Sequence, residues 1–119
     1  QHRQIYEVVR RAQQAGIDFV RPGVRMSQID AAVRQVIVDA GYGAAFITRT
    51  GHGIGLMVHE QPDVSTACDV VAQEGMVFSI EPGIYLPGDT GVRIEDLVLV
   101  TADGCEVLTH YPKELQIIS

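Results

Sequence analysis

The sequence lacks an excess of basic residues. It holds 9 Lys and Arg against 15 Asp and Glu, which gives a formal net charge of -6 and a pI near 5.0. Nucleic acids and anionic membranes are bound through basic surfaces. We therefore expect neither nucleic acid nor a membrane as the main partner of this chain.

The sequence also lacks a long apolar run. No segment approaches the roughly 20 apolar residues that cross a bilayer, and no basic start precedes an apolar stretch as in a signal peptide. We expect neither feature in this stretch. Because Gln1 is not methionine and opens directly into an amphipathic pattern, we expect residues of the same fold upstream of it.

Cysteine is scarce. Cys68 and Cys105 are the only two, and their spacing is not that of a metal site. A chain of 119 residues with 46% hydrophobic content can bury a modest core without a disulfide, and it is not a disordered tail. We predict one domain at most, with both cysteines as free thiols in the cytoplasm.

The first third of the chain carries two helical patterns. Apolar residues recur at helical spacing in two sets: Ile5, Val8, Val9, Ala12 and Ala15, then Ile29, Val33, Val36, Ile37 and Ala40. We predict that Gly16 ends the first helix and Gly41 the second. Ser27 followed by Asp30 indicates a capping box at the start of the second helix. Arg21-Pro22-Gly23 between them is typical of a turn.

From Ala45 onward the pattern changes to short apolar runs separated by Gly, Pro and Asp. The predicted strands are Phe46–Thr50, Leu56–Val58, Met76–Ile80 and Val92–Thr101. Helices followed by closely spaced strands indicate an α+β domain, with an antiparallel sheet and the helices on one face.

A histidine between glycines separates the first two of these runs, in Gly51-His52-Gly53-Ile54-Gly55, with His59-Glu60 close behind. The glycines let the backbone approach closely and leave the imidazole uncrowded, as a metal ligand requires. Such a histidine is more often an ordinary turn residue. A phosphate-binding loop is disfavoured because a strand rather than a helix follows.

Two further clusters carry glutamates: Ile80-Glu81-Pro82-Gly83 and Val92-Arg93-Ile94-Glu95-Asp96. The apolar neighbours of Glu81 and Glu95 predict burial, which requires pairing, hydrogen bonds or a metal. Arg93 shares a strand face with Glu95, and the two could form an exposed pair of little energetic consequence. One imidazole and two carboxylates together match the ligands of divalent Mn, Co, Fe or Zn.

The order of these clusters resembles the pita-bread metallopeptidases, a family that includes methionine aminopeptidase, aminopeptidase P and prolidase. The resemblance covers essentially the whole chain. Its strongest blocks are Thr50–Gly55 with His59-Glu60, Gly75–Tyr85, Gly91–Asp96 and Val100-Thr101. It implies that residues 1–119 form the C-terminal half of the catalytic domain, the N-terminal half being missing.

The resemblance also implies a pair of divalent metals held by two aspartates, one histidine and two glutamates. The last three correspond to His52, Glu81 and Glu95, and the aspartates are expected before Gln1. Hydrolysis would take place at this two-metal site, with Glu81 also transferring a proton.

Further positions take roles by the same resemblance. His59 corresponds to a substrate-binding histidine that stabilises charge on the scissile carbonyl. Tyr85 and Arg93 correspond to residues whose hydrogen bonds orient the metal ligands. Core packing for Tyr85 and a structural ion pair for Arg93 remain the alternatives.

The branch is indicated by the residues around the ligands. Xaa-Pro peptidases typically show the Glu-Pro-Gly-X-Tyr and Arg-Ile-Glu-Asp forms seen here, whereas methionine aminopeptidases have Glu-His-Thr in place of Glu95-Asp96-Leu97. One departure is Thr48, where many Xaa-Pro peptidases have a histidine, because threonine cannot carry a proton near neutral pH.

The resemblance thus favours an enzyme that cleaves N-terminal Xaa-Pro peptide bonds, as an aminopeptidase or dipeptidase. A creatinase-like C–N hydrolase without metals and a peptide-binding module derived from the fold remain as alternatives. We expect the 119 residues alone to bind metal weakly and to show no appreciable activity. Strand edges that should pair with the missing half would be exposed, which favours either a homodimer or aggregation of the fragment.

Overall fold

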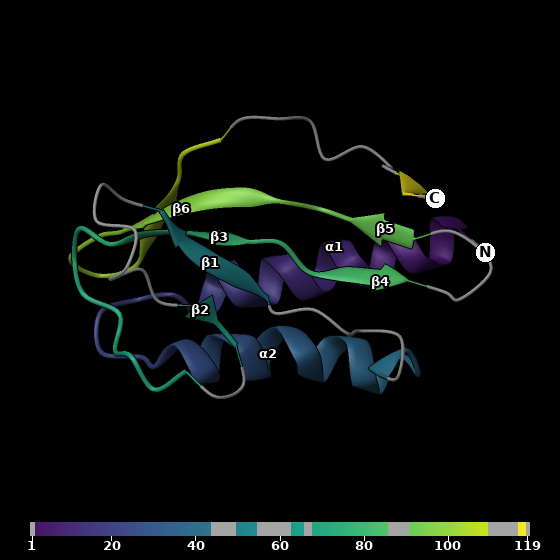
Figure 1. Cartoon of the computed structure of the whole chain (residues 1–119), viewed down its shortest axis with the longest axis horizontal. Coiled ribbons are helices and arrows are strands. Elements are labelled where there is room, and N and C mark those ends of the chain that lie inside the picture. The colour runs from purple at the N-terminus through teal and green to yellow at the C-terminus, as the bar shows by residue number, and fades with distance from the viewer. Residues whose placement is uncertain are drawn as a thin grey trace.

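The computed structural model describes residues 2–43, 50–54, 63–65, 68–85, 91–109 and 117–118. Two helices come first and short antiparallel strands follow (Figure 1). The elements are α1 (His2–Phe19), α2 (Met26–Asp39), β1 (Gly51–Ile54), β2 (Asp63–Val64), β3 (Val77–Ile80), β4 (Gly83–Tyr85), β5 (Gly91–Arg93), β6 (Asp96–Val100), β7 (Cys105–Val107) and β8 (Ile117–Ile118). The predicted order of helices before sheet is confirmed.

The described strands form two sheets. A five-stranded sheet has the order β2-β1-β3-β6-β7, and a three-stranded sheet has the order β4-β5-β8. The run predicted as one strand over Val92–Thr101 is therefore divided between β5 and β6. The pairing of β3 with β6 continues in step into the pairing of β4 with β5. Ile80 pairs with Asp96, and three residues further along each segment Gly83 pairs with Arg93, so no residue is inserted on either side.

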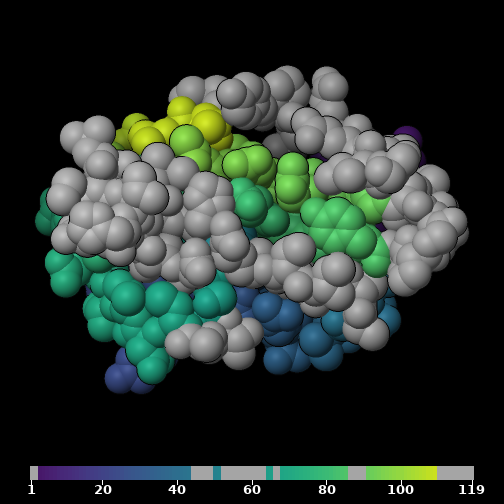
Figure 2. Space-filling view, viewed as in Figure 1, coloured from purple at the N-terminus to yellow at the C-terminus, as the bar shows by residue number. Residues whose placement is uncertain are grey.

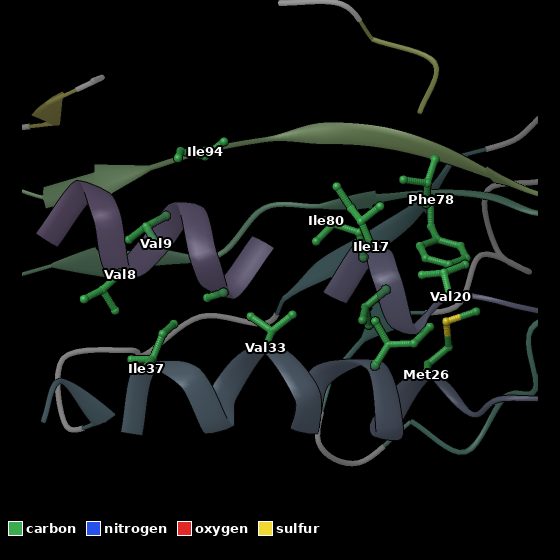
Figure 3. Close-up of a cluster of buried hydrophobic side chains, with 14 of the residues drawn as sticks. Val8, Val9, Ile17, Val20, Met26, Val33, Ile37, Phe78, Ile80 and Ile94 are labelled. Atoms are coloured by element: carbon green, nitrogen blue, oxygen red, sulfur yellow. The ribbon is translucent and has the colours of Figure 1, made fainter. Parts of the chain in front are cut away.

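Both helices lie on the same side of the strands, as predicted (Figure 1). In the space-filling view little of α1 (purple) is visible, whereas green side chains of the strands show near the centre (Figure 2). The core lies between sheet and helices (Figure 3). It includes Val8, Val9, Ile17, Val20, Met26, Val33, Ile37, Phe78, Ile80 and Ile94.

The prediction that Gly16 ends the first helix was wrong, because α1 continues to Phe19. Gly16 lies where α1 meets Val33 of α2 and Ile80 of β3. The glycine is there because α1 has no room for a larger side chain at this contact. Its role is close packing rather than helix termination.

The predicted end of the second helix is confirmed. Gly41 follows α2 with a positive φ of 89°, which glycine adopts without strain. The N–H of Gly41 donates to Val38 O over 2.9 Å, and the N–H of Tyr42 donates to Ile37 O over 3.0 Å. These two bonds form a Schellman motif, which satisfies the last carbonyls of the helix.

The predicted start of the second helix was wrong. Arg25 is the N-cap residue, and its N–H donates to Gln28 Oε1 over 2.8 Å. Ser27 is not the N-cap residue, and its N–H donates to Cys68 O over 2.8 Å. Asp30 points into the protein and is buried. The side-chain cap thus comes from Gln28 instead of the predicted pair, and backbone carbonyls of residues 68 and 70 accept the next two N–H groups.

Among the remaining strands, β3 confirms the prediction over Met76–Ile80. The segments 46–49 and 56–58, predicted as strands, lie outside the described residues. β2, β4, β7 and β8 were not predicted, since each has only two or three residues and depends on its pairing partner. β1 was not predicted either, because the glycines of segment 51–55 indicate an interruption between strands rather than a strand. The turn over Arg21-Pro22-Gly23 is confirmed, with a φ of 97° at Gly23.

Cys68 and Cys105 are free thiols, as predicted. In the parts of the chain that the structure describes, neither helix combines the length and apolar character needed to traverse a bilayer.

Candidate metal site

Glu81 and Glu95 occupy opposing positions on two antiparallel segments. The shared register of the two sheets places them opposite one another in the gap between β3–β6 and β4–β5. The N–H of Ile94 donates to Pro82 O over 3.3 Å across this gap. Directly opposite residues have Cβ atoms about 4.5–5.5 Å apart. The fold therefore sets the backbone positions of two glutamates opposite one another, although they are fourteen positions apart in sequence.

The predicted burial of the carboxylates was wrong for Glu95 and partly right for Glu81. Glu81 is half-buried and Glu95 is exposed, whereas their neighbours Ile80 and Ile94 are buried. Because side chains alternate between the two faces of extended backbone, the glutamates lie on the face turned away from the helices. Arg93 is also exposed, so it shares this face with Glu95 as predicted.

Tyr85 lies across two glycines on the same face. A Cβ atom on Gly83 would lie 2.8 Å from the Tyr85 hydroxyl oxygen, and one on Gly91 would lie 2.5 Å from Cδ1 of the ring. The ring therefore covers both glycines, with its hydroxyl over Gly83 and nearer to the glutamate pair. Tyr85 is half-buried and lies on the face away from the core, which disfavours the core-packing alternative.

β1 approaches the end of β3 closely beside this pair. A Cβ atom on Gly51 would overlap the carbonyl oxygen of Ser79. The N–H of Glu81 donates to Thr50 O over 2.6 Å. Gly51 is thus required by this backbone contact, in addition to the freedom it was predicted to give the histidine that follows.

The backbone of His52 lies in β1, paired with Asp63 of β2. The next residue, Gly53, pairs with Phe78 of β3. The structure places the backbone of the predicted histidine ligand on the strand that neighbours β3. His59 and Thr48 lie outside the described residues.

The described residues contain no group of three or more His, Cys, Asp or Glu arranged to hold a metal ion. The donor pair itself fits a divalent cation. Like charges directly opposite one another destabilise a sheet, and a cation between two carboxylates removes that repulsion. Carboxylate oxygens are suitable ligands for Mn and other hard or borderline divalent metals.

Sequence reasoning missed the role of buried polar residues on the two helices and directly before β1. Asp30 and Thr50 are buried and hydrogen-bonded to one another over 2.6 Å. Gln13 is buried in α1, and its Nε2 donates to Ile80 O over 3.4 Å. Asp30 and Arg34 at i,i+4 spacing were the available signal. Their burial is not visible in the sequence.

The chain belongs to metallopeptidase family M24, whose profile matches residues 1–102. It is 56% identical over 116 residues to the Xaa-Pro dipeptidase of Lactobacillus delbrueckii subsp. lactis, covering 98% of this chain and 32% of that protein. The prolidase from Pyrococcus furiosus matches with a TM-score of 0.89 and 45% identity, covering 92% of this chain and 33% of that one.

Methionine aminopeptidase from Rickettsia prowazekii matches with a TM-score of 0.77 and 27% identity, over 91% of this chain and 52% of that one. The predicted fold class is thereby confirmed as part of a pita-bread domain. The chain spans about a third of the length of the curated relatives it matches.

Proposed function

We propose that residues 1–119 are the C-terminal half of the catalytic domain of a metallopeptidase that hydrolyses N-terminal Xaa-Pro peptide bonds. The observation that carries this proposal is the opposition of Glu81 and Glu95. Membership of family M24 supports peptidase chemistry. The names of two relatives, an Xaa-Pro dipeptidase and a prolidase, support the substrate class.

The proposed site holds two divalent metal ions, with manganese as our first choice among Mn, Co, Fe and Zn. His52, Glu81 and Glu95 would be ligands, together with two aspartates from the rest of the protein. When bound, the metals would polarise the scissile carbonyl and make water a good nucleophile at neutral pH.

The side chains would share the remaining tasks. Glu81 would accept the proton of the attacking water and return it to the leaving amine. Its backbone N–H is fixed to Thr50 O, which favours a single position for the carboxylate. His59 would stabilise charge on the carbonyl oxygen. Tyr85 and Arg93, which share the face of the glutamates, would orient the ligands.

The partner would be a peptide rather than nucleic acid or a membrane, which the net charge of -6 supports. We propose a cytoplasmic location, consistent with two free thiols. A homodimer is supported by β7, the edge strand of the five-stranded sheet in the described part of the chain.

Glu81→Gln in the full-length protein tests this function. We expect the variant to fold, by circular dichroism, and to lose about a thousandfold in kcat on an Xaa-Pro dipeptide with Mn²⁺. Glu106→Gln is a matched control, because Glu106 is exposed on β7. Near-normal turnover by Glu81→Gln would contradict the proposal. His52→Ala should lower the metal content, and an unchanged content would remove His52 from the ligand set.

A further inference from the structure

Asp30 is a buried carboxylate on α2, with 1% of its surface exposed. It accepts hydrogen bonds from Arg34 Nε at 2.9 Å, from Arg34 Nη2 at 3.1 Å and from Thr50 Oγ1 at 2.6 Å. A buried carboxylate is tolerated only when it is paired and hydrogen-bonded. The bidentate contact with Arg34 fixes the orientation of the Asp30 carboxylate. Asp30 thus presents one oriented acceptor to Thr50.

Thr50 joins three segments of the fold. Its hydroxyl donates to Asp30 of α2, and its N–H donates to Val64 O of β2 over 2.8 Å. Its carbonyl oxygen accepts the N–H of Glu81 over 2.6 Å. Thr50 is fully buried, so water cannot easily replace the hydroxyl contact. The position of this residue therefore depends on α2.

The segment that Thr50 controls contains the proposed metal ligands. Glu81 is attached to it directly, and His52 follows it by two residues on β1. β1 is also held to β3 by the pairs Gly53–Phe78 and Ile54–Val77 and lies close to it at Gly51 and Ser79. A shift of Thr50 would therefore displace the backbone of both ligands.

We propose that Asp30 is a positioning residue for the metal site, acting through the Thr50 hydroxyl on the backbone of Glu81 and His52. This inference rests on the proposed function, since it assigns the hydrogen bonds that join Arg34, Asp30 and Thr50 to the support of metal binding. It differs from a purely structural role, in which loss of the network would lower stability and leave metal affinity unchanged in the folded protein.

Mn²⁺ binding to the full-length protein, measured by isothermal titration calorimetry, separates the two roles. Thr50→Val keeps the branched shape and removes the donor, and we expect Mn²⁺ affinity to fall about tenfold or more. Thr50→Ser keeps the hydroxyl and should recover most of the affinity. Ile37→Ala is a control for stability, because it empties a buried site two turns along α2 and should leave Mn²⁺ affinity unchanged.

An unchanged affinity in Thr50→Val would overturn the inference. Equal weakening in Ile37→Ala and Thr50→Val at equal loss of stability would overturn it too. If Thr50→Val does not fold, Arg34→Lys decides, since it loosens Asp30 while leaving Thr50 intact. We expect it to weaken Mn²⁺ binding severalfold, and unchanged binding would refute the role. Absence of binding of Mn²⁺, Co²⁺, Fe²⁺ and Zn²⁺ alike by the unaltered protein would refute the proposed function, and this inference with it.

Discussion

Gly16 of α1 and Val33 of α2 lie so close that a Cβ atom on Gly16 would be 2.5 Å from Val33 Cγ2. A second methyl, Cγ2 of Ile80 in β3, would be 3.3 Å away. The valine side chain is stiff at χ1 and cannot turn aside easily. This contact sets how near the two helices approach each other.

Gly16→Ala should therefore destabilise the protein. Alanine gains about 1 kcal/mol in helix propensity over glycine, but overpacking costs about 1–3 kcal/mol, and we expect the overpacking to dominate. The measurement is the free energy of unfolding in urea. Combining Gly16→Ala with Val33→Ala should give a smaller loss than the sum of the single changes. Strict additivity would show that the two residues do not meet.

Gly51→Ala should be more harmful, because the new Cβ atom would overlap the backbone carbonyl of Ser79 rather than a side chain. We expect a loss of about 3 kcal/mol or more in unfolding free energy, together with weaker Mn²⁺ binding. Gly104→Ala is the matched control, since nothing lies within 4 Å of its Cβ position. Similar stability of the two variants would contradict the close contact between β1 and β3.

Tyr85→Phe should separate catalysis from stability. The ring still covers Gly83 and Gly91, so we expect unfolding free energy to change by less than about 0.5 kcal/mol. Loss of the hydroxyl should lower kcat about tenfold on an Xaa-Pro dipeptide, if Tyr85 orients the ligands as proposed. If Tyr85→Phe keeps both the kcat and the stability of the unaltered protein, the Tyr85 hydroxyl does not orient the metal ligands.

The Cys105 thiol should react slowly in the folded protein. Burial, and to a smaller extent the negative charge of Asp18, raise the pKa of Cys105 above its ordinary value of 9.0. Its thiol also donates to Ile17 O over 3.4 Å. In a Cys68→Ser background, alkylation by iodoacetamide near pH 9 should be slower in the folded than in the unfolded protein. Equal rates would contradict a shielded thiol.

The same shift affects stability at alkaline pH. Because the folded-state pKa of Cys105 is raised, its contribution to stability is fully present below pH 9.0 and is lost as the pH rises through the folded-state value. Unfolding measured across this range should show a decline that Cys105→Ser removes. Asp18→Asn should bring the folded-state pKa of Cys105 closer to 9.0, because it removes the negative charge that contributes the smaller part of the shift. The pH range over which stability declines should therefore become narrower.

Several elements followed from local sequence alone. The apolar stripes predicted both helices, because a helix of this length buries one face whatever its partner. Gly41 predicted the end of α2, because a left-handed residue is required there. The blocks around His52, Glu81 and Glu95 predicted the family, since they combine strand, glycine and donor patterns in a fixed order.

Other features depended on distant partners. Gly16 is required for helix packing, and the sequence does not distinguish such a glycine from one that ends a helix. Ser27 and Asp30 matched a capping box, yet the caps came from Arg25, Gln28 and the carbonyls of residues 68 and 70. The exposure of Glu95 was also missed, because apolar neighbours in an extended segment bury one face and leave the other to solvent.

The sequence by itself determined the two helices and the α+β class, because these depend on local periodicity. Only the tertiary structure decided that Glu81 faces Glu95, that Thr50 holds Glu81, and that Asp30 is buried against Thr50. Those relationships depend on strand register and helix packing, which join residues far apart along the chain and are established only when the core forms.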